Sequence, residues 1–159
     1  MPERKPDRKS DRRVTHATFS IERTYDVPPA KVFAAFASIE AKARWFTGSN
    51  EWQQGRRSMD FRVGGKEHLS GGRKDQPVHH FDAIYQDIVP DERIIYSYEM
   101  HRDKERISVS LATIEFKRAG KGTRMLFTEQ GAFLDDFDTP QIREEGTKEL
   151  LDQLGRALK

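Results

Sequence analysis

The segment Arg93-Ile94-Ile95-Tyr96-Ser97-Tyr98-Glu99-Met100-His101 gives the clearest structural signal in the chain. Ile94, Tyr96, Tyr98 and Met100 fall on one side of an extended backbone, because successive side chains of a strand point to opposite faces. The residues between them fall on the other side. This alternation with a period of two predicts an antiparallel β-strand with one face packed against a core.

Similar patterns on both sides of this segment predict further strands, separated by turn-forming residues. Pro90-Asp91-Glu92 has turn chemistry, and Ala119-Gly120-Lys121-Gly122 predicts a hairpin turn farther along. Further strands are expected at residues 16–27, 57–63, 66–69, 78–89, 107–117 and 123–130.

Three helices are predicted from apolar spacing and from proline at helix starts. Pro29 suits the first position of a helix that continues over residues 30–37, and a second short helix is expected over residues 41–46. Thr139-Pro140 predicts the start of a long terminal helix over residues 141–159. Its apolar face recurs at helical spacing and consists of Thr147, Leu150, Leu151, Leu154 and Leu158.

The order of these elements is one strand, two short helices, five or six antiparallel strands and one long helix. Strands and helices do not alternate along the chain, which argues against a parallel α/β fold. The terminal helix is the one predicted element long enough to cover a face of the sheet. A sheet that curves around one helix leaves a hollow between them, and hollows of this kind bind small molecules.

The chain resembles the SRPBCC superfamily, also called START/Bet v 1-like, and within it the branch named after the activator of heat-shock protein 90 ATPase. The resemblance covers about residues 16–158 and implies an α+β helix-grip fold, in which a curved antiparallel sheet wraps around a long C-terminal helix and encloses a ligand cavity. The branch often has Gly-Trp inside the last helix, where this chain has Gly146-Thr147. The matching segments are Val27-Pro28-Pro29-Ala30-Lys31-Val32-Phe33, Arg44-Trp45-Phe46, Met59-Asp60-Phe61-Arg62-Val63-Gly64-Gly65, Val89-Pro90-Asp91-Glu92-Arg93-Ile94 and Gly122-Thr123-Arg124-Met125.

The charges divide the chain into a tail and one domain. The chain has 159 residues, 28 of them Lys or Arg and 26 Asp or Glu. Residues 1–13 hold six of the basic and three of the acidic side chains and almost no apolar ones, so we expect a disordered charged tail. Residues 14–159 are expected to form a single domain. This domain is nearly neutral, which argues against nucleic acid as a partner.

The composition also excludes several kinds of site and location. The chain has no cysteine, which excludes disulfides, thiolate metal ligands and a cysteine nucleophile. No apolar stretch is long enough to span a membrane, and no apolar signal region follows Met1, so we expect a cytoplasmic protein with no membrane partner. The oligomeric state, monomer or homodimer, stays open.

Aromatic and methionine side chains supply the candidate binding site. Tyrosine and tryptophan combine a large apolar body with a hydrogen-bonding tip, and methionine adapts to irregular shapes. Each such residue alone is more often part of a filled core, but the set, with two tyrosines on one sheet face, favours a pocket for a mostly apolar ligand. The candidate ligand-binding residues are Phe36, Trp45, Phe46, Met59, Phe61, Tyr96, Tyr98, Met100, Gly146 and Leu150.

Polar residues give weaker functional signals. Asp60 and Arg62 are interpreted as an ion pair that supports the bend at Gly64-Gly65. Adjacent His79 and His80 point to opposite faces of a strand and therefore do not chelate one ion together. A zinc site needs three ligands that meet across strands, which a sequence does not reveal, so no metal site and no cofactor are predicted.

Acid–base chemistry is the remaining possibility. His101, Glu99 and Asp82 are candidates for a general acid or base, because some members of the superfamily are polyketide cyclases or dehydratases. No nucleophile elbow, phosphate loop or metal signature accompanies them, and no catalytic residue is predicted.

The sequence therefore favours a binding protein for a small hydrophobic or amphipathic molecule, and not an enzyme. The alternatives are a chaperone-interaction module and a cyclase-like or dehydratase-like enzyme.

Overall fold

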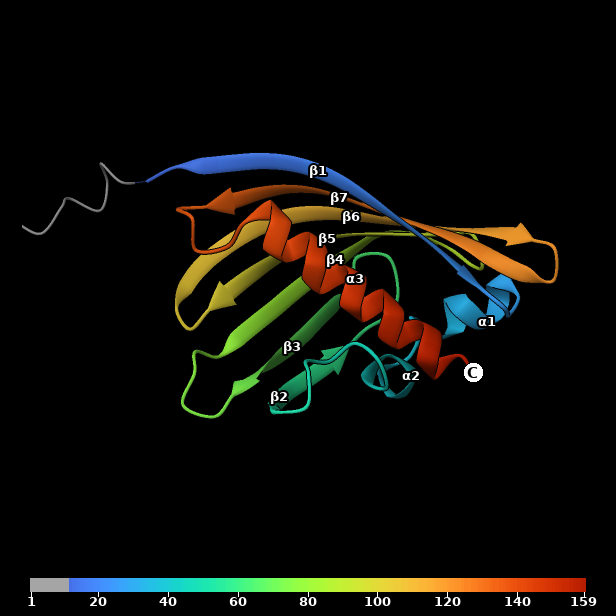
Figure 1. Cartoon of the computed structure of the whole chain (residues 1–159), viewed down its shortest axis with the longest axis horizontal. Coiled ribbons are helices and arrows are strands. Elements are labelled where there is room, and N and C mark those ends of the chain that lie inside the picture. The colour runs from blue at the N-terminus through green and yellow to red at the C-terminus, as the bar shows by residue number, and fades with distance from the viewer. Residues whose placement is uncertain (1–11) are drawn as a thin grey trace, which may run out of the picture.

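A computed structural model describes residues 12–159, which form a curved sheet wrapped around one long helix. The seven strands are antiparallel and lie in the order β1-β7-β6-β5-β4-β3-β2. Figure 1 shows α3 lying diagonally across the concave face, with α1 and α2 near its C-terminal end. This is the helix-grip α+β fold predicted from the sequence. The strands are β1 (Val14–Tyr25), β2 (Trp52–Met59), β3 (Lys66–Arg73), β4 (His79–Val89), β5 (Arg93–Arg102), β6 (Glu105–Ala119) and β7 (Gly122–Leu134), and the helices are α1 (Pro29–Ala34), α2 (Ile39–Ala43) and α3 (Pro140–Ala157).

Local sequence signals set where the helices begin. Pro29 and Pro140 occupy the first turns of α1 and α3. A backbone N–H at these positions forms no hydrogen bond within the helix, so proline, which lacks the N–H, causes no loss there. The hydroxyl of Ser38 accepts from the backbone N–H of Ala41 at the start of α2, and the hydroxyl of Thr139 accepts from that of Ile142 at the start of α3. These caps fix the direction in which α3 enters the concave face.

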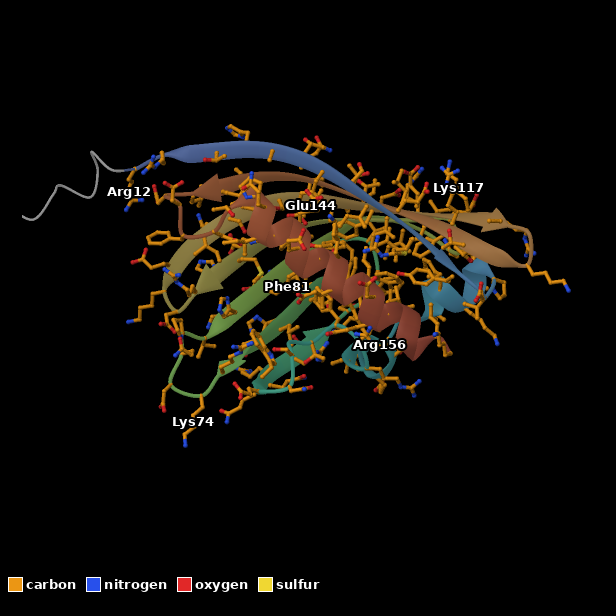
Figure 2. The ribbon with its side chains drawn as sticks, in the orientation of Figure 1. Arg12, Lys74, Phe81, Lys117, Glu144 and Arg156 are labelled. Carbon is orange, nitrogen blue, oxygen red and sulfur yellow. The ribbon has the colours of Figure 1, made fainter. Side chains whose placement is uncertain are left out.

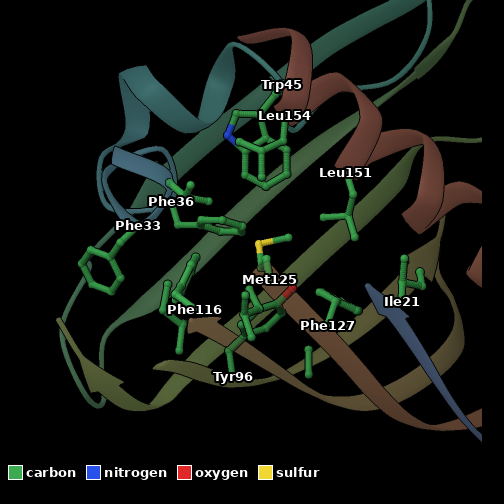
Figure 3. Close-up of a cluster of buried hydrophobic side chains, with 14 of the residues drawn as sticks. Ile21, Phe33, Phe36, Trp45, Tyr96, Phe116, Met125, Phe127, Leu151 and Leu154 are labelled. Carbon is green, nitrogen blue, oxygen red and sulfur yellow. The ribbon is translucent and has the colours of Figure 1, made fainter. Parts of the chain in front are cut away.

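The apolar core fills the part of the concave face near α1 and the C-terminal half of α3. Met125 on β7 and Leu154 on α3 are fully buried there, and Phe36 packs edge-on against Trp45 with 4.8 Å between ring centroids. Figure 3 shows these side chains converging from the segments after α1 and α2, from α3 and from the sheet. As the alternation predicts, Ile94, Tyr96 and Tyr98 of β5 face this interior.

Polar contacts tie α3 to both edges of the structure. The Tyr25 hydroxyl on β1 donates to the Leu151 carbonyl over 2.8 Å, and Arg23 pairs with Asp152 over 3.0 Å. On the opposite side, Nε2 of Gln153 donates to the carbonyl of Trp45 over 2.6 Å. The helix is thereby held over the sheet along its C-terminal half.

The strand predicted over residues 57–63 is wrong at its C-terminal end. β2 stops at Met59, and Asp60 to Gly65 form a turn. Gly64 has φ +83°, and a Cβ on Gly65 would collide with the Asp60 carbonyl, so the chain turns here through conformations that favour glycine. Arg62 and Asp60 do pair, over 2.8 Å, but on this exposed turn and not along a strand face.

Several strands extend beyond their predicted bounds: β2 already begins at Trp52, and β6 spans Glu105–Ala119. β3 continues through Arg73, and β7 continues to Leu134, which pairs with Val14 at the start of β1. The predicted tail lies mostly at residues 1–11, outside the described residues, while Arg13 forms an ion pair with Asp136 over 2.8 Å. Among the described residues, no helix is long and apolar enough to cross a membrane.

Candidate functional site

A cavity of about 370 Å³ lies between the concave face of the sheet and the N-terminal half of α3. Tyr96 and Tyr98 of β5 and Phe81 of β4 form its floor, and Leu150 and Leu151 of α3 lie opposite. The segment from Trp45 to Trp52, after α2, closes one side. Phe81 is buried, while Figure 2 shows Lys74 and Lys117 extending outward at the periphery.

Eight of the ten predicted residues line this cavity, and two do not. The eight are Phe36, Trp45, Phe46, Tyr96, Tyr98, Met100, Gly146 and Leu150. Phe61 lies in the turn after β2 and packs edge-on against Phe33 and Tyr85, at centroid distances of 5.7 and 5.0 Å. Met59 lies at the end of β2, the outermost strand, opposite Glu67. Phe61 was placed on the cavity side by an alternation that the backbone does not continue, whereas Met59 lies within β2 and does not line the cavity.

Gly146 lies at the mouth of the cavity and not at its floor. The residue is exposed, a Cβ on it would meet no atom within 4 Å, and nearby Ile142 is 64% exposed. Both line the cavity, which therefore opens to solvent along the first turns of α3.

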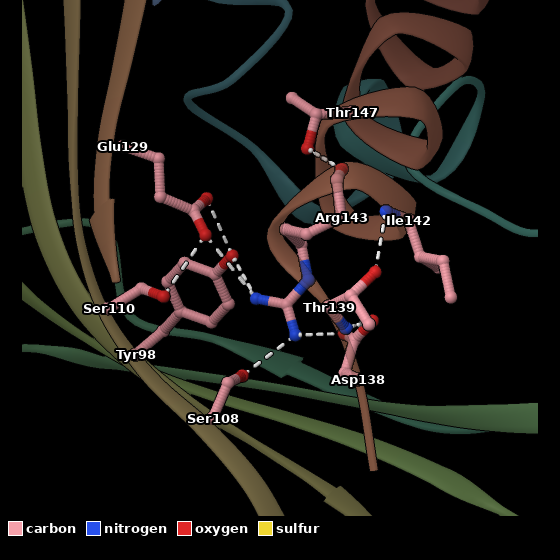
Figure 4. Close-up of polar contacts among 9 residues, drawn as sticks. All are labelled: Tyr98, Ser108, Ser110, Glu129, Asp138, Thr139, Ile142, Arg143 and Thr147. Atoms are coloured by element: carbon pink, nitrogen blue, oxygen red, sulfur yellow. Dashed lines mark hydrogen bonds and ion pairs between the residues drawn. The ribbon is translucent and has the colours of Figure 1, made fainter. Parts of the chain in front are cut away.

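One end of the cavity carries a buried polar network centred on Arg143 of α3 (Figure 4). Its Nη1 donates to the Tyr98 hydroxyl over 2.8 Å and contacts Glu129 Oε2 at 3.3 Å. Its Nη2 donates to Ser108 Oγ and to Asp138 Oδ2, each over 2.7 Å. The planar guanidinium thus joins α3 to β5, β6, β7 and the loop before the helix.

Glu129 of β7 is the deepest charge in this network, with 1% of its surface exposed. Its Oε1 accepts from the Tyr98 hydroxyl over 2.7 Å, and its Oε2 accepts from Ser110 over 3.0 Å and from Arg143. Burial raises the pKa of Glu129, while Arg143 and the two hydroxyl donors act in the opposite direction. Because every donor points at the carboxylate, the network stabilises its ionised form.

The neighbouring groups respond to the same environment. Burial raises the pKa of the Tyr98 hydroxyl, so that hydroxyl stays protonated and acts as a donor to Glu129. Burial by itself would lower the pKa of Arg143, but Tyr98, Glu129 and Asp138 together raise it. The guanidinium therefore remains a cation.

A second buried ion pair lies at the other end of the cavity. Lys42 Nζ of α2 is 2.7 Å from Glu67 Oε1 of β3, and the two side chains are only 3% and 1% exposed. The Tyr85 hydroxyl donates to the same carboxylate oxygen over 2.6 Å. The ammonium also lies over the ring of Phe46, 4.4 Å from its centroid. Lys42 contributes to the cavity wall, but its charge is balanced by Glu67.

Carboxylates balance the cations of both buried clusters, whereas the exposed Arg73 at the edge of the lining donates to Ser49 Oγ over 3.1 Å. Arg143 has two carboxylates within reach, Glu129 and Asp138, and Lys42 has one. The rest of the deep wall is aromatic or aliphatic. Trp52 lines the cavity, and its Nε1, which lies against Gly71, is buried with no hydrogen-bond partner among the described residues. Such a wall suits an uncharged, mostly apolar molecule.

Sequence reasoning missed Arg143, Glu129, Lys42 and Glu67, although periodicity contained signals for three of them. Arg143 precedes Thr147 by one helical turn and so extends the inward face of α3. Glu129 alternates with Phe127 on the inward face of β7, and Glu67 alternates with Leu69 on that of β3. A charge at an inward position of an amphipathic element is the signal for a buried ion pair.

The remaining candidates fall outside the cavity or at its edge. His79 lines the cavity, and His80 lies on the opposite face, where its ring is near that of His68, as the strand geometry predicts. Asp82, Glu99 and His101 do not line the cavity.

Comparison with known proteins places this geometry in a family. The sequence model described as activator of Hsp90 ATPase homolog 1-like protein matches residues 26–159. No protein with a curated description matches the sequence.

Solved structures resemble the chain over most of its length. An uncharacterised protein from Rhizobium leguminosarum is 45% identical, with a TM-score of 0.88, over 92% of this chain and 97% of that one. The Mll3558 protein from Rhizobium loti is 44% identical, with a TM-score of 0.85, over 91% and 99%. An AHSA1-like protein from Aeromonas hydrophila, 20% identical over 89% and 92%, shares the fold with a TM-score of 0.70.

Proposed function

This chain belongs to the activator of Hsp90 ATPase homolog 1-like family of the SRPBCC superfamily, and from that premise we propose that it binds a small hydrophobic or amphipathic molecule without transforming it. The observation that carries the proposal is the cavity of about 370 Å³ beneath α3, which has an apolar floor and opens to solvent. Cavities of a few hundred cubic ångströms with few polar groups are typical of small-molecule sites.

The charged side chains of the cavity wall indicate what charge the ligand carries. The cation of Arg143 is shared between Glu129 and Asp138, and that of Lys42 is held by Glu67. An anionic ligand would have to compete with these carboxylates, and a second buried charge carries a large desolvation cost. The proposed ligand is therefore uncharged. Its contacts are with Tyr96, Phe81, Leu150 and the other apolar lining residues.

Glu129 is the observation that favours the enzymatic alternative. A buried carboxylate with a raised pKa in a cavity wall is typical of a general acid or base. Both of its oxygens, however, already accept hydrogen bonds from Tyr98, Ser110 and Arg143. Three of the roughly four acceptor sites of this carboxylate are therefore occupied and the residue is 1% exposed, so Glu129 is better suited to positioning Arg143 and Tyr98 than to taking a proton.

The chaperone-interaction alternative derives from the family description. Exposed large apolar side chains among the described residues include Val63 in the turn after β2, Ile142 on α3, and Val109 with Leu111 on one face of β6, so most of them lie on different parts of the structure. A docking surface for another protein normally gathers such residues into one patch. The proposal therefore assigns no chaperone partner, and it places the protein in the cytoplasm.

An uncharged fluorescent probe tests ligand binding directly. N-phenyl-1-naphthylamine becomes strongly fluorescent in apolar surroundings, and we expect saturable binding by the wild-type chain. Thr147 is buried and lines the cavity, so Thr147→Trp fills part of the space. Glu145→Trp is the matched control, because that side chain is 74% exposed on the same helix.

The expected result is that Thr147→Trp loses probe binding by about tenfold or more while Glu145→Trp retains it. Circular dichroism of both variants verifies that the fold is intact. Absence of probe binding to the wild-type chain, or equal binding by the two variants, would contradict the proposal. Turnover of a bound small molecule by the wild-type chain, lost in Glu129→Gln, would instead support the enzymatic alternative.

A further inference from the structure

The convex face of the sheet, on the side away from the cavity, carries a cluster of metal-binding side chains. Asp82 of β4 and Glu99 of β5 are directly opposite each other in the strand register. His101 lies two residues after Glu99 and therefore projects from the same face. All three are partly exposed, so the cluster is accessible from solvent.

The geometry of these three side chains fits a single ion. One ligand atom from each of Asp82, Glu99 and His101 lies within 4.8 Å of the other two. Metal–ligand bonds to histidine nitrogen and carboxylate oxygen are about 2.0–2.2 Å, so ligand atoms around one ion are separated by roughly 3–4.4 Å. Small rotamer adjustments bring the three groups into this range.

Two further histidines, His68 and His80, lie next to the Asp82–Glu99–His101 cluster. His80 is directly opposite His101 in the strand register, and its ring centroid is 5.8 Å from that of His68. His68 Nδ1 is 2.7 Å from Asp82 Oδ1. A histidine hydrogen-bonded to a ligating carboxylate is a common outer partner that fixes the orientation of the ligand. Three of the chain's five histidines thus gather at this position.

We propose that this face binds one divalent transition-metal ion of the zinc type, with Asp82, Glu99 and His101 as ligands, His80 as the adjacent fourth donor and His68 as the outer partner of Asp82. Mixed imidazole and carboxylate donors suit Zn²⁺ and similar ions better than Mg²⁺ or Ca²⁺, which prefer oxygen donors alone. The site lies on the opposite face of the sheet from the cavity and does not depend on the proposed ligand.

Arg106 lies next to the proposed metal site and is expected to weaken metal binding. Its Nε is 3.2 Å from Glu99 Oε2, so the guanidinium competes with a cation for that carboxylate. Arg106 is half exposed, and its removal frees Glu99 without removing a metal ligand. The proposal therefore predicts opposite effects for the loss of Arg106 and the loss of His101.

Isothermal titration calorimetry with ZnCl₂ tests the site on chelator-treated chain without a polyhistidine tag, and Co²⁺ absorption reports on the ligand set. We expect one ion per chain. Asp82→Asn and His101→Asn each weaken Zn²⁺ binding by at least about tenfold, and His68→Ala weakens it about tenfold. His79→Asn leaves binding unchanged, because His79 faces the cavity. Arg106→Gln strengthens it.

Two results would overturn the proposal. One is the absence of saturable Zn²⁺ binding at one ion per chain. The other is Zn²⁺ binding that is equal in the wild-type chain, Asp82→Asn and His101→Asn. Far-ultraviolet circular dichroism of each variant in chelator establishes that a loss of binding is not a loss of fold, and retained N-phenyl-1-naphthylamine binding separates this site from the cavity.

Discussion

The guanidinium of Arg143 on α3 donates through Nη1 to the hydroxyl of Tyr98 on β5, with 2.8 Å between the two atoms. The same hydroxyl donates to Glu129 Oε1 over 2.7 Å. A helix residue, a tyrosine of the central sheet and a buried acid are thus joined in one unit. This unit holds the N-terminal half of α3 at a fixed distance above the cavity floor, where the apolar packing of Leu151 and Leu154 does not reach.

Removal of the cation from this unit is expected to be strongly destabilising. In Arg143→Met the carboxylate of Glu129, which is 1% exposed, keeps its two hydroxyl donors but loses its counter-charge. Breaking a buried ion pair from one side typically lowers the free energy of unfolding by about 3–5 kcal/mol. Urea denaturation monitored by circular dichroism measures this loss.

Two further variants separate charge from packing at this position. Arg143→Met combined with Glu129→Gln removes both charges of the Arg143–Glu129 pair but leaves Asp138 without its cation, and is expected to recover part of the lost stability. Arg156→Met, an exposed substitution near the end of α3, is expected to change the free energy of unfolding by less than about 0.5 kcal/mol. If Arg143→Met is no more destabilising than Arg156→Met, the network does not hold the helix.

The Lys42–Glu67 pair leads to a parallel prediction at the other end of the cavity. Lys42→Met removes the paired cation of buried Glu67 and leaves it beside the Tyr85 hydroxyl with only the electrostatic influence of Arg57, and we expect a loss of about 3 kcal/mol in the free energy of unfolding. Lys42→Met with Glu67→Gln retains an acceptor for Tyr85 and is expected to approach wild-type stability. A double-mutant cycle with no coupling between the two positions would contradict this account.

The spacing of apolar residues predicted most of the fold, because each strand or helix that buries one face carries apolar residues at the period of that face. Ile94, Tyr96 and Tyr98 alternate because β5 is covered on one face, and Leu151 and Leu154 recur because α3 buries one stripe. Alternation of apolar and polar residues did not predict the end of β2, because a turn ends that strand within the alternating segment. Met59 to Val63 alternates in sequence, yet the strand ends at Met59 because the chain must turn at Gly64-Gly65.

The candidate site was predicted less completely, because its polar groups are paired across long sequence separations. Glu67 is recognisable as an inward charge on β3, but its partner Lys42 comes from α2, 25 residues earlier in the chain. The Asp82–Glu99–His101 cluster likewise depends on the register of β4 against β5. Register is set by the whole sheet and is not written in either strand alone.

The pH dependence of stability is expected to report on His79 in the cavity wall. Burial, together with the nearby cations of Arg102 and Arg143, lowers the pKa of His79 below 6.5, although Asp138 and Asp103 oppose the shift. As the pH falls through about 6.5, His79 therefore becomes protonated in the unfolded chain but stays neutral in the folded chain. Stability from this group is fully present above about pH 6.5 and decreases as the pH falls toward the folded-state pKa.

His79→Asn is expected to reduce this acid sensitivity. Free energies of unfolding at about pH 7.5 and about pH 5.5, measured in chelator, should differ less in His79→Asn than in the wild-type chain. His16→Asn on β1 is the control, because His16 is exposed. An unchanged difference in His79→Asn would show that other groups govern the acid response.

Glycine substitutions on α3 are expected to have effects that depend on the space beside each residue. At Gly146 a Cβ would meet no atom within 4 Å, so Gly146→Ala gains helix propensity without a clash and should raise the free energy of unfolding by up to about 1 kcal/mol. At Gly155 a Cβ would lie 3.2 Å from Tyr25 Cε1, so Gly155→Ala must displace a ring whose hydroxyl is bonded to Leu151. We expect a smaller gain or a loss there, measured by urea denaturation of the two variants side by side. Equal gains at both positions would mean that Tyr25 moves freely and does not fix α3 against β1.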